Sequence, residues 1–177
     1  HPTTPQVVSG FVKDASGATQ AGQTVQTLAN GNLVGSTSSG ANGFYYMLLG
    51  NNSIADSKSV LSFVNTQGGT ATFTTAANQN LTGFDITTGR VTVTHNDAIN
   101  VTSVLGQAKG GNTDDTRYTV SGSNVSVNGD LYVTAAGEVV GDALAVSGAT
   151  TVNAGANDIS LNNASNDFIG AVTLTGN

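Results

Sequence analysis

Residues 123–160 read SNVSVNGDLYVTAAGEVVGDALAVSGATTVNAGANDIS, and the spacing of apolar side chains in this stretch decides the fold of the second half of the chain. Alternating apolar pairs stand at Val125/Val127 and Leu131/Val133, and Val139 follows them. The pattern returns about 20 residues later, at Leu144/Val146, Thr150/Val152 and Ile159. Short strands recurring at this period between Gly-, Asn- and Asp-rich corners are typical of a coiled solenoid. We therefore expect a right-handed parallel β-helix with three strands per turn.

The pattern continues to the last residues of the sequence. The run 162–167 (NNASND) lacks an apolar pair, and we expect Phe168 to restore the register before Val172 and Leu174. This part of the chain, ANDISLNNASNDFIGAVTLTGN, resembles filamentous-haemagglutinin-like bacterial exoproteins exported by two-partner secretion, and related autotransporter adhesins. The resemblance implies coils that stack into a long fibre outside the cell.

The first half of the chain follows a different pattern, in which short strands alternate with turns. Asn30-Gly31 is a hairpin signal because both residues tolerate a positive φ. The aromatic run 44–46 (FYY) is expected to be a core strand rather than a ligand-stacking platform. A short helix is expected at residues 97–107, capped by Asn96 or Asp97. Strands are expected at residues 7–12, 23–28, 33–38, 44–49, 60–64, 70–75, 81–86 and 90–95.

A resemblance supports this interpretation over about forty residues. The segments SGFVKDASGATQAGQTVQT and TSSGANGFYYM resemble carboxypeptidase-regulatory-like and collagen-adhesin B-type modules, which implies an Ig-like β-sandwich. Thr19 and Gln20 depart from the family pattern, and Lys13 beside Asp14 in a turn does not fit its isopeptide chemistry. The expected all-β organisation is an extended leader (1–6), a sandwich (7–120) and β-helix coils (121–177).

Composition excludes several classes of function. The net charge is −6 and the five basic residues are scattered singly, so the chain offers no basic patch for nucleic acid or an anionic membrane. Cysteine is absent, which rules out disulfides, a thiolate zinc site and a cysteine nucleophile. No apolar run is long enough to span a bilayer, so we expect no membrane insertion.

Residues that could carry catalysis are few. A hydrolytic triad would need His95, Asp97 and a serine, and their closeness in sequence does not establish triad geometry. Acidic residues beside Gly or Asn in the coils could form a carboxylate pair for polysaccharide cleavage. We expect them instead to be corner residues that bond backbone N–H groups. These residues are Asp130, Glu138, Asp142, Asp158 and Asp167.

Two further kinds of site rest on weak signals. Asp114 and Asp115 in GGNTDDTR are weak calcium candidates, together with Asn112, although the segment lacks the dense Asp ladder of a calcium loop. No other metal site and no cofactor is expected. Five Asn-x-Ser/Thr sequons are possible glycosylation sites. They begin at Asn51, Asn80, Asn100, Asn124 and Asn163.

These observations predict a secreted, non-enzymatic structural and adhesive protein of the bacterial cell surface, forming a segment of a fibrous adhesin. Its expected partner is a host or neighbouring-cell surface, or copies of itself. The coil pattern shows no polar cap, so either more coils or another subunit is expected to cover that end. An alternative is an extracellular filament whose subunits join by β-strand addition. A third possibility is a solenoid enzyme that acts on polysaccharides.

Overall fold

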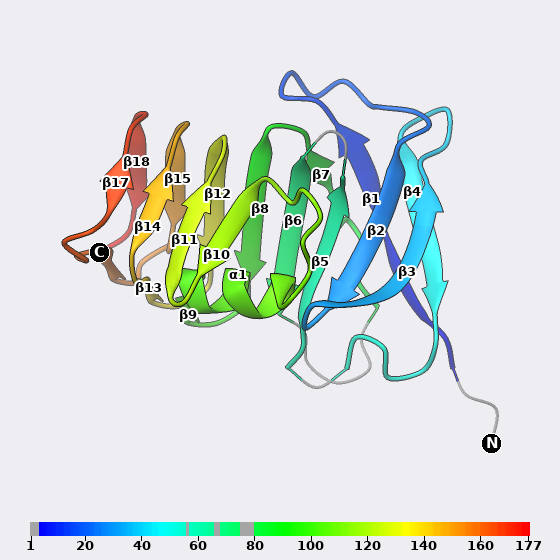
Figure 1. The fold of residues 1–177 in the computed structure, drawn as a ribbon, viewed down its shortest axis with the longest axis horizontal. Helices are drawn as coiled ribbons and strands as arrows, with labels where there is room; N and C mark the ends of the chain where they lie inside the picture. The colour runs from blue at the N-terminus through cyan, green and yellow to red at the C-terminus, as the bar shows by residue number, and fades with distance from the viewer. Residues whose placement is uncertain (1–3, 56, 66–67, 75–79) are drawn as a thin grey trace.

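The computed structural model describes residues 4–55, 57–65, 68–74 and 80–177. Its strands form a two-layered sandwich followed by a stack of coils, and β4 and β18 lie towards opposite ends of the long axis (Figure 1). The prediction of an all-β chain with a sandwich followed by the start of a parallel β-helix is confirmed.

The sandwich has one three-stranded and one four-stranded layer. The first layer has the order β4-β1-β7 and contains β1 (Gln6–Lys13), β4 (Phe44–Leu49) and β7 (Ile86–Thr87). The second layer consists of β2 (Thr24–Ala29), β3 (Asn32–Ser38), β5 (Ser59–Val64) and β6 (Gly69–Thr74). Apolar side chains from both layers form the core between them, among them Val8, Val12, Val25, Tyr45, Val60 and Ile86.

One sheet runs from the sandwich into the coils. β6 pairs in parallel with β8 (Arg90–His95), where Ala71 lies opposite Thr92. The parallel ladder then continues through β12 (Asp130–Ala135), β15 (Thr150–Asn153) and β18 (Val172–Thr175). The result is a single eight-stranded sheet of order β18-β15-β12-β8-β6-β5-β2-β3. The sandwich and the coil stack are therefore joined by backbone hydrogen bonds.

Two shorter sheets complete the coils. One stacks β9 (Ile99–Asn100), β13 (Val139–Val140) and β16 (Ile159–Ser160) in parallel. The other stacks β11 (Asn124–Val127), β14 (Leu144–Val146) and β17 (Asp167–Phe168) in parallel, and begins with the antiparallel β10 (Tyr118–Ser121). The coil stack thus includes strands that come before residue 121, the predicted start of the coils, as well as strands that follow it.

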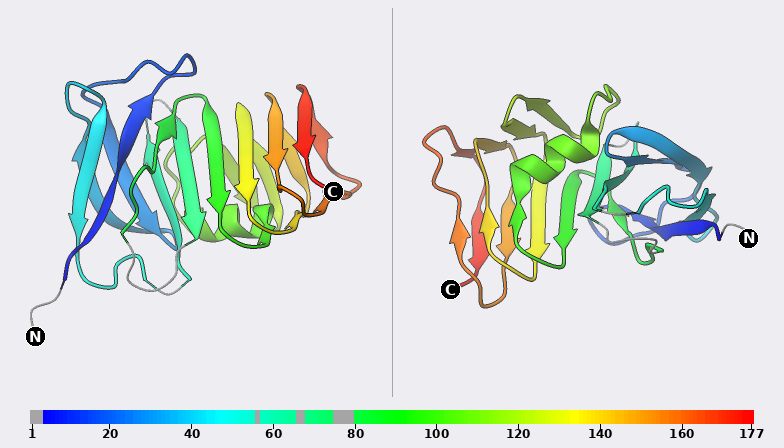
Figure 2. Two further views of the ribbon diagram at one scale, coloured as in Figure 1. Left: turned by 180° about the vertical axis from the view of Figure 1, so that it is seen from behind. Right: turned by 90° about the horizontal axis from the view of Figure 1, so that it is seen from below.

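Helix α1 (Val101–Lys109) lies along the stack at its junction with the sandwich (Figure 2, right). Its buried side chains belong to a core that also contains side chains from the sandwich sheet and from the coils. Members of this core include Leu61, Phe63, Val101, Leu105, Ala108, Val125 and Leu131. The helix and the sandwich sheet therefore close the first end of the coil interior.

No helix in the described part of the chain is both long and apolar enough to cross a membrane.

The predicted start of the helix was wrong. Asn100, not Asn96 or Asp97, is the N-cap, and its side-chain oxygen accepts a 3.1 Å hydrogen bond from the amide of Ser103. Residues 99–100 form β9 and pair with β13, so the helix cannot begin before Val101. The pairing of β9 with β13 therefore decides where the helix begins, and the capping signal at Asn96 and Asp97 does not.

Two predicted strands differ in extent. The strand expected at residues 81–86 is reduced to Ile86–Thr87, because Gly83 has a φ of +65° and turns the chain before it. Leu81 makes only an isolated parallel bridge to Val8. The strand expected at 70–75 is β6, and its last predicted residue, Thr75, lies outside the described residues.

The aromatic run at the start of β4 is only half buried. Tyr45, Met47 and Leu49 point into the sandwich core. Their strand neighbours Phe44, Tyr46 and Leu48 are exposed on the outer face, because successive side chains of a strand point to opposite sides. The prediction of a core strand holds for one face, and the other face carries an exposed apolar strip.

Candidate functional site

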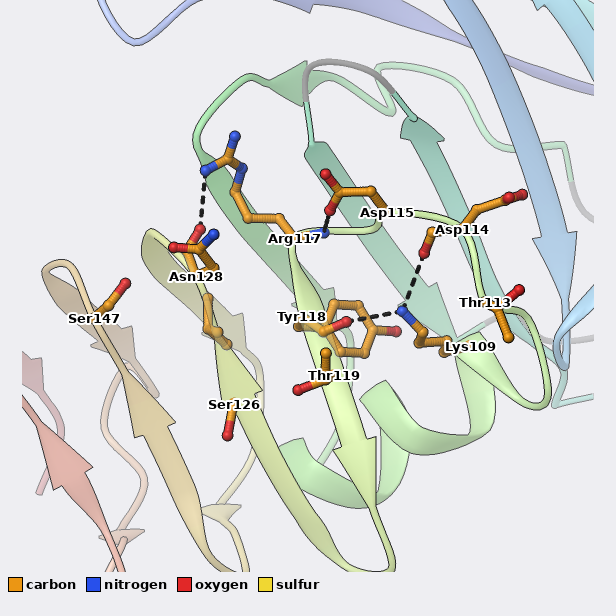
Figure 3. Close-up of a pocket in the computed structure, with 11 residues that line it drawn as sticks. Lys109, Thr113, Asp114, Asp115, Arg117, Tyr118, Thr119, Ser126, Asn128 and Ser147 are labelled. Carbon is orange, nitrogen blue, oxygen red and sulfur yellow. Dashed lines mark hydrogen bonds between the residues drawn. The ribbon is translucent and has the colours of Figure 1, made fainter.

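A hollow of about 390 Å³ lies where the turn after α1 meets the first coils (Figure 3). The segment between α1 and β10 forms one wall, and strands β10, β11 and the corner before β15 form the other. The lining residues are Lys109, Thr113, Asp114, Asp115, Arg117, Tyr118, Thr119, Ser126, Val127, Asn128 and Ser147.

Lys109 is buried at the base of the hollow. Its ammonium group donates hydrogen bonds to the carbonyl of Asp114 (3.2 Å), the hydroxyl of Thr116 (2.9 Å) and the carbonyl of Tyr118 (2.8 Å). Burial lowers the pKa of Lys109, and the nearby carboxylates of Asp115 and Asp114 partly offset this effect. With three acceptors, the ammonium holds the turn in place and is a poor candidate nucleophile.

Arg117 ties the hollow to the sandwich. Its backbone has a left-handed φ of 64°, and its guanidinium donates to the carbonyl oxygens of Gly68 (2.7 Å) and Asn128 (3.0 Å). Gly68 precedes β6 and Asn128 follows β11, so one side chain joins the two parts of the fold. The arginine bonds backbone oxygens on both sides of the junction.

The two calcium candidates line this hollow but engage protein groups. The Oδ1 atom of Asp115 accepts a 2.9 Å hydrogen bond from the amide of Arg117. The backbone amide of Asp114 donates to the side-chain oxygen of Asn112, at 2.8 Å, so that Asn112 closes a turn. Among the described residues, no group of three or more His, Cys, Asp or Glu side chains gathers in a way that could hold a metal ion.

The acidic residues of the coils lie at separate positions. Asp130 accepts a hydrogen bond from the amide of Ala149 in the next coil (2.9 Å). Asp142 accepts one from the hydroxyl of Thr102 in α1 (3.2 Å). Glu138, Asp158 and Asp167 are exposed. Asp130 bonds a backbone N–H group, as predicted for these corner residues, whereas the carboxylate of Asp142 bonds a side-chain hydroxyl instead.

His95 ends β8, and its neighbourhood offers little for catalysis. Burial lowers the pKa of His95, and the charge of Asp97 partly opposes this. The Oδ1 atom of Asp97 accepts a hydrogen bond from the amide of Ala98, at 2.8 Å. Neither His95 nor Asp97 lines the hollow of Figure 3.

The five sequons fall into two groups. In three sequons the asparagine side-chain oxygen accepts a hydrogen bond from a backbone amide: Asn80 from Val7, Asn100 from Ser103 and Asn163 from Ser165. The other two are exposed, Asn51 in a turn after β4 and Asn124 at the start of β11. Asn80 and Asn163 are exposed as well, so four of the five sequon asparagines reach the surface, and Asn100 is half-buried.

Two features of the structure were not predicted from the sequence. The hydrogen bonds of Lys109 join residues on the two sides of a turn, and a lone lysine in the sequence carries no signal for that role. The exposed strip of Phe44, Tyr46 and Leu48 could have been found by applying strand alternation to the aromatic run.

The coil region matches a known family. A family model described as "Repeats of unknown function (DUF5649)" matches residues 110–175, which run from the turn after α1 to the end of β18. No curated protein and no solved structure gives a significant match. The second half of the chain is therefore a β-rich repeat region of a kind with no assigned activity.

Proposed function

We propose that the chain is a non-enzymatic, secreted structural protein of the bacterial cell surface and a segment of a fibrous adhesin. The observation that carries this proposal is the eight-stranded sheet that passes without interruption from the sandwich through the coils. A shared ladder and a shared core make the two parts one rigid body. We expect such a body to resist bending more strongly than two domains joined by a flexible linker, as a rod requires.

The arrangement of the ends supports a rod. The sandwich sheet and α1 close one end of the coil interior, whereas the outermost strands β16, β17 and β18 each lie at the edge of their sheet. Solenoids grow by stacking identical units, and each unit contacts only its neighbours. The coils therefore stack along one axis that leads away from the sandwich, as in a rod.

The exposed strip on β4 is a candidate contact surface for adhesion. Phe44, Tyr46 and Leu48 lie on its outer face, and the ring centroids of Phe44 and Tyr46 are 6.2 Å apart. The ring of Phe11 on β1 packs edge-on against Phe44 at 5.3 Å. Contiguous exposed apolar side chains on a soluble protein often mark interaction surfaces.

A bead-retention experiment tests the adhesive function. Beads coated with the full chain should be retained on layers of bacterial or host cells under flow more strongly than beads coated with the denatured chain. The triple variant Phe44→Ser, Tyr46→Ser, Leu48→Ser should lose this retention. The matched control Thr119→Ala, Ser126→Ala, Thr134→Ala, also exposed on strands, should keep it. Equal retention of native and denatured chain would refute adhesion.

One observation favours a second candidate, an extracellular filament of identical subunits. The two edge strands of the eight-stranded sheet, β3 and β18, contain no charged residue, and charge is a common device that prevents edge-to-edge pairing. Strand addition between subunits could then extend the sheet. The proposed leader includes Pro5, which cannot donate a backbone hydrogen bond, and its first three residues lie outside the described residues. Negative-stain electron microscopy of the chain distinguishes long fibres from single particles.

A further inference from the structure

Strand β4 is the free edge of the first sandwich layer, and its pairing with β1 fixes which of its backbone groups face that edge. The amide of Val12 donates to the carbonyl of Gly43, at 2.9 Å, at the start of the antiparallel β1–β4 ladder. Hydrogen-bonded pairs alternate along antiparallel strands, so every second residue of β4, beginning with Tyr45, bonds to β1. The amides and carbonyls of Tyr46 and Leu48 therefore point away from β1, towards the free edge.

The edge of β4 is satisfied at its start and open further along. Phe44 also faces the edge, but its amide donates to the side-chain oxygen of Asn42 (3.1 Å) and its carbonyl accepts the amide of Gly40 (2.8 Å). Among the described residues, no group bonds to the outward amides and carbonyls of Tyr46 and Leu48. Their side chains are 58% and 67% exposed. Unpaired groups along a strand edge are a template for another strand.

We propose that β4 pairs in antiparallel fashion with β4 of a second copy of this chain, with Tyr46 of each copy opposite the partner's Leu48. The inference rests on the contact surface of the proposed function and names its partner. In this register both residue pairs exchange two hydrogen bonds, so every open backbone group of the edge is used. A register centred on Tyr46 itself would instead pair Leu48 with the partner's Phe44, whose backbone groups are already engaged.

The distribution of charge favours a second copy as the occupant. Residues 15–55, which include β2, β3 and β4, contain no Asp, Glu, Lys, Arg or His, although the net charge of the chain is −6. All the acidic residues lie elsewhere, so two copies that meet at β4 bring no like charges together there. Beside β4, the charges of Lys13 and Asp85 neutralise each other in an ion pair at 3.2 Å. This face therefore offers no net charge to attract a charged partner.

The side chains of the strip also fit an apolar strand better than a glycan. In the proposed register, Tyr46 and Leu48 of the two copies lie side by side on the outer face, next to the ring of Phe44. The hydroxyl of Tyr46 is the one polar side-chain atom that these three residues carry. A small-molecule or sugar ligand is oriented by several precisely placed polar groups, which the strip lacks.

The pairing would join two molecules head to head. In Figure 1, β4 and β18 lie towards opposite ends of the long axis, and β1 and β7 continue the first layer from β4 towards the coils. The coils of the two copies would therefore lead away in opposite directions. A two-fold contact of this kind uses the same surface on both subunits and closes on itself, so it yields a dimer rather than a fibre.

Single cysteines test the register, because the chain has no cysteine of its own. A mixture of Tyr46→Cys and a tagged Leu48→Cys should form a mixed disulfide under mild oxidation, since the Cα atoms of a hydrogen-bonded pair lie about 5.5 Å apart. Either variant alone places its cysteines diagonally, about 7–8 Å apart, and should link at least about tenfold less. Preferential linking of Tyr46→Cys to itself would overturn the register, and linking no stronger than that of Thr134→Cys would overturn the contact.

Sedimentation equilibrium tests the dimer without cysteines. Leu48→Pro removes an amide that β1 does not use, so it should keep the circular dichroism of the fold and weaken the dimer by about tenfold or more. Leu48→Ser should also weaken it, whereas Leu33→Ser, which changes a 57% exposed leucine on β3, should not. A chain that stays monomeric at about 1 mM would overturn the proposal, as would fibres or equal effects of the two serine variants.

The outcome is separable from that of the adhesion experiment. Beads retained on cells by a chain that stays monomeric in solution would leave adhesion standing and refute the second copy as partner. A chain that dimerises through β4 but retains no beads on any cell layer would refute adhesion and support the pairing.

Discussion

The ammonium group of Lys109 lies 2.8 Å from the backbone carbonyl oxygen of Tyr118 and 5.3 Å from the centre of the Tyr118 ring. Lys109 ends α1 and Tyr118 begins β10, so this contact closes the turn that joins the helix to the coils. The hydroxyl of Tyr118 in turn donates to the carbonyl of Leu105 in α1, at 2.7 Å. The pair holds the helix against the start of the stack.

Replacing Lys109 by Met should destabilise the protein by about 3 kcal/mol, because two buried acceptors and one half-buried acceptor lose a charged donor. Lys58→Met is the matched control, since the Lys58 ammonium donates to carbonyls at the protein surface, and it should cost about 1 kcal/mol or less. Urea unfolding followed by circular dichroism measures both. Equal losses in the two variants would show that the buried contacts of Lys109 contribute little.

Alkaline pH should destabilise the chain through its buried tyrosines. Burial raises the pKa of Tyr45 well above its ordinary value of 10.0, and its hydroxyl donates to the carbonyl of Phe84. The unfolded chain releases this proton first, so the contribution is fully present below about pH 10 and falls above it by about 1.4 kcal/mol per pH unit. Urea unfolding of wild type and Tyr45→Phe between pH 7 and 11 should show wild type more stable at pH 7 and the difference shrinking above pH 10. Parallel curves would contradict this.

Much of the fold could be predicted because its determinants are local or periodic. The repeat of Val125, Leu144 and their neighbours fixed the coils, and turn residues such as Asn30-Gly31 marked the hairpins of the sandwich. The junction could not be predicted. β6 and β8 pair in parallel through their backbones. Their side chains resemble those of any buried strand, so no residue pattern in the sequence marks the register of this pair.

The candidate site was harder to predict for a related reason. Asp114 and Asp115 were predicted as candidate ligands because they are carboxylates. The groups that organise the hollow are instead the cations Lys109 and Arg117, and all but one of their acceptors are backbone carbonyls, which any residue supplies. The corner glycines were expected as turn residues. Their close approach exists only once successive coils are stacked, so it cannot be derived from one corner alone.

The turn after β1 should depend on the charge of Asp14. The Ser16 hydroxyl, together with the backbone amide of Ala18, donates to this carboxylate and lowers the pKa of Asp14 below its ordinary value of 3.8. Its stabilising contribution is present above about pH 4 and is lost as pH falls through the lowered pKa. NMR titration should find the Asp14 pKa depressed, and Ser16→Ala should bring it closer to 3.8. An unchanged pKa in Ser16→Ala would show that the hydroxyl is not the main cause.

Calcium should not stabilise the chain. The Oδ1 atom of Asp115 already accepts a hydrogen bond from the amide of Arg117, and among the described residues no third acidic or histidine side chain joins Asp114 and Asp115 as a ligand. Calcium at about 1 mM, the upper end of the range for extracellular modules, should leave the melting temperature unchanged. The variant Asp114→Asn, Asp115→Asn serves as the control. A rise in melting temperature that this variant abolishes would establish a calcium site.

Four glycines, Gly89, Gly129, Gly148 and Gly170, lie over one another at one corner of the stack, where successive coils approach more closely than a side chain allows. Gly148→Ala should cost about 3 kcal/mol, because its Cβ would meet the backbone of Gly129 at 2.7 Å and the carboxylate of Asp130. Gly111→Ala is the matched control: a Cβ there meets nothing within 4 Å, so the change should stay within about 0.5 kcal/mol. Hydrogen exchange in β14, β15 and β18 should rise in Gly148→Ala, because the coils on both sides of the corner separate. A loss no larger than that of Gly111→Ala would mean that the corner can widen without strain, and the glycine would then not set the register of the stack.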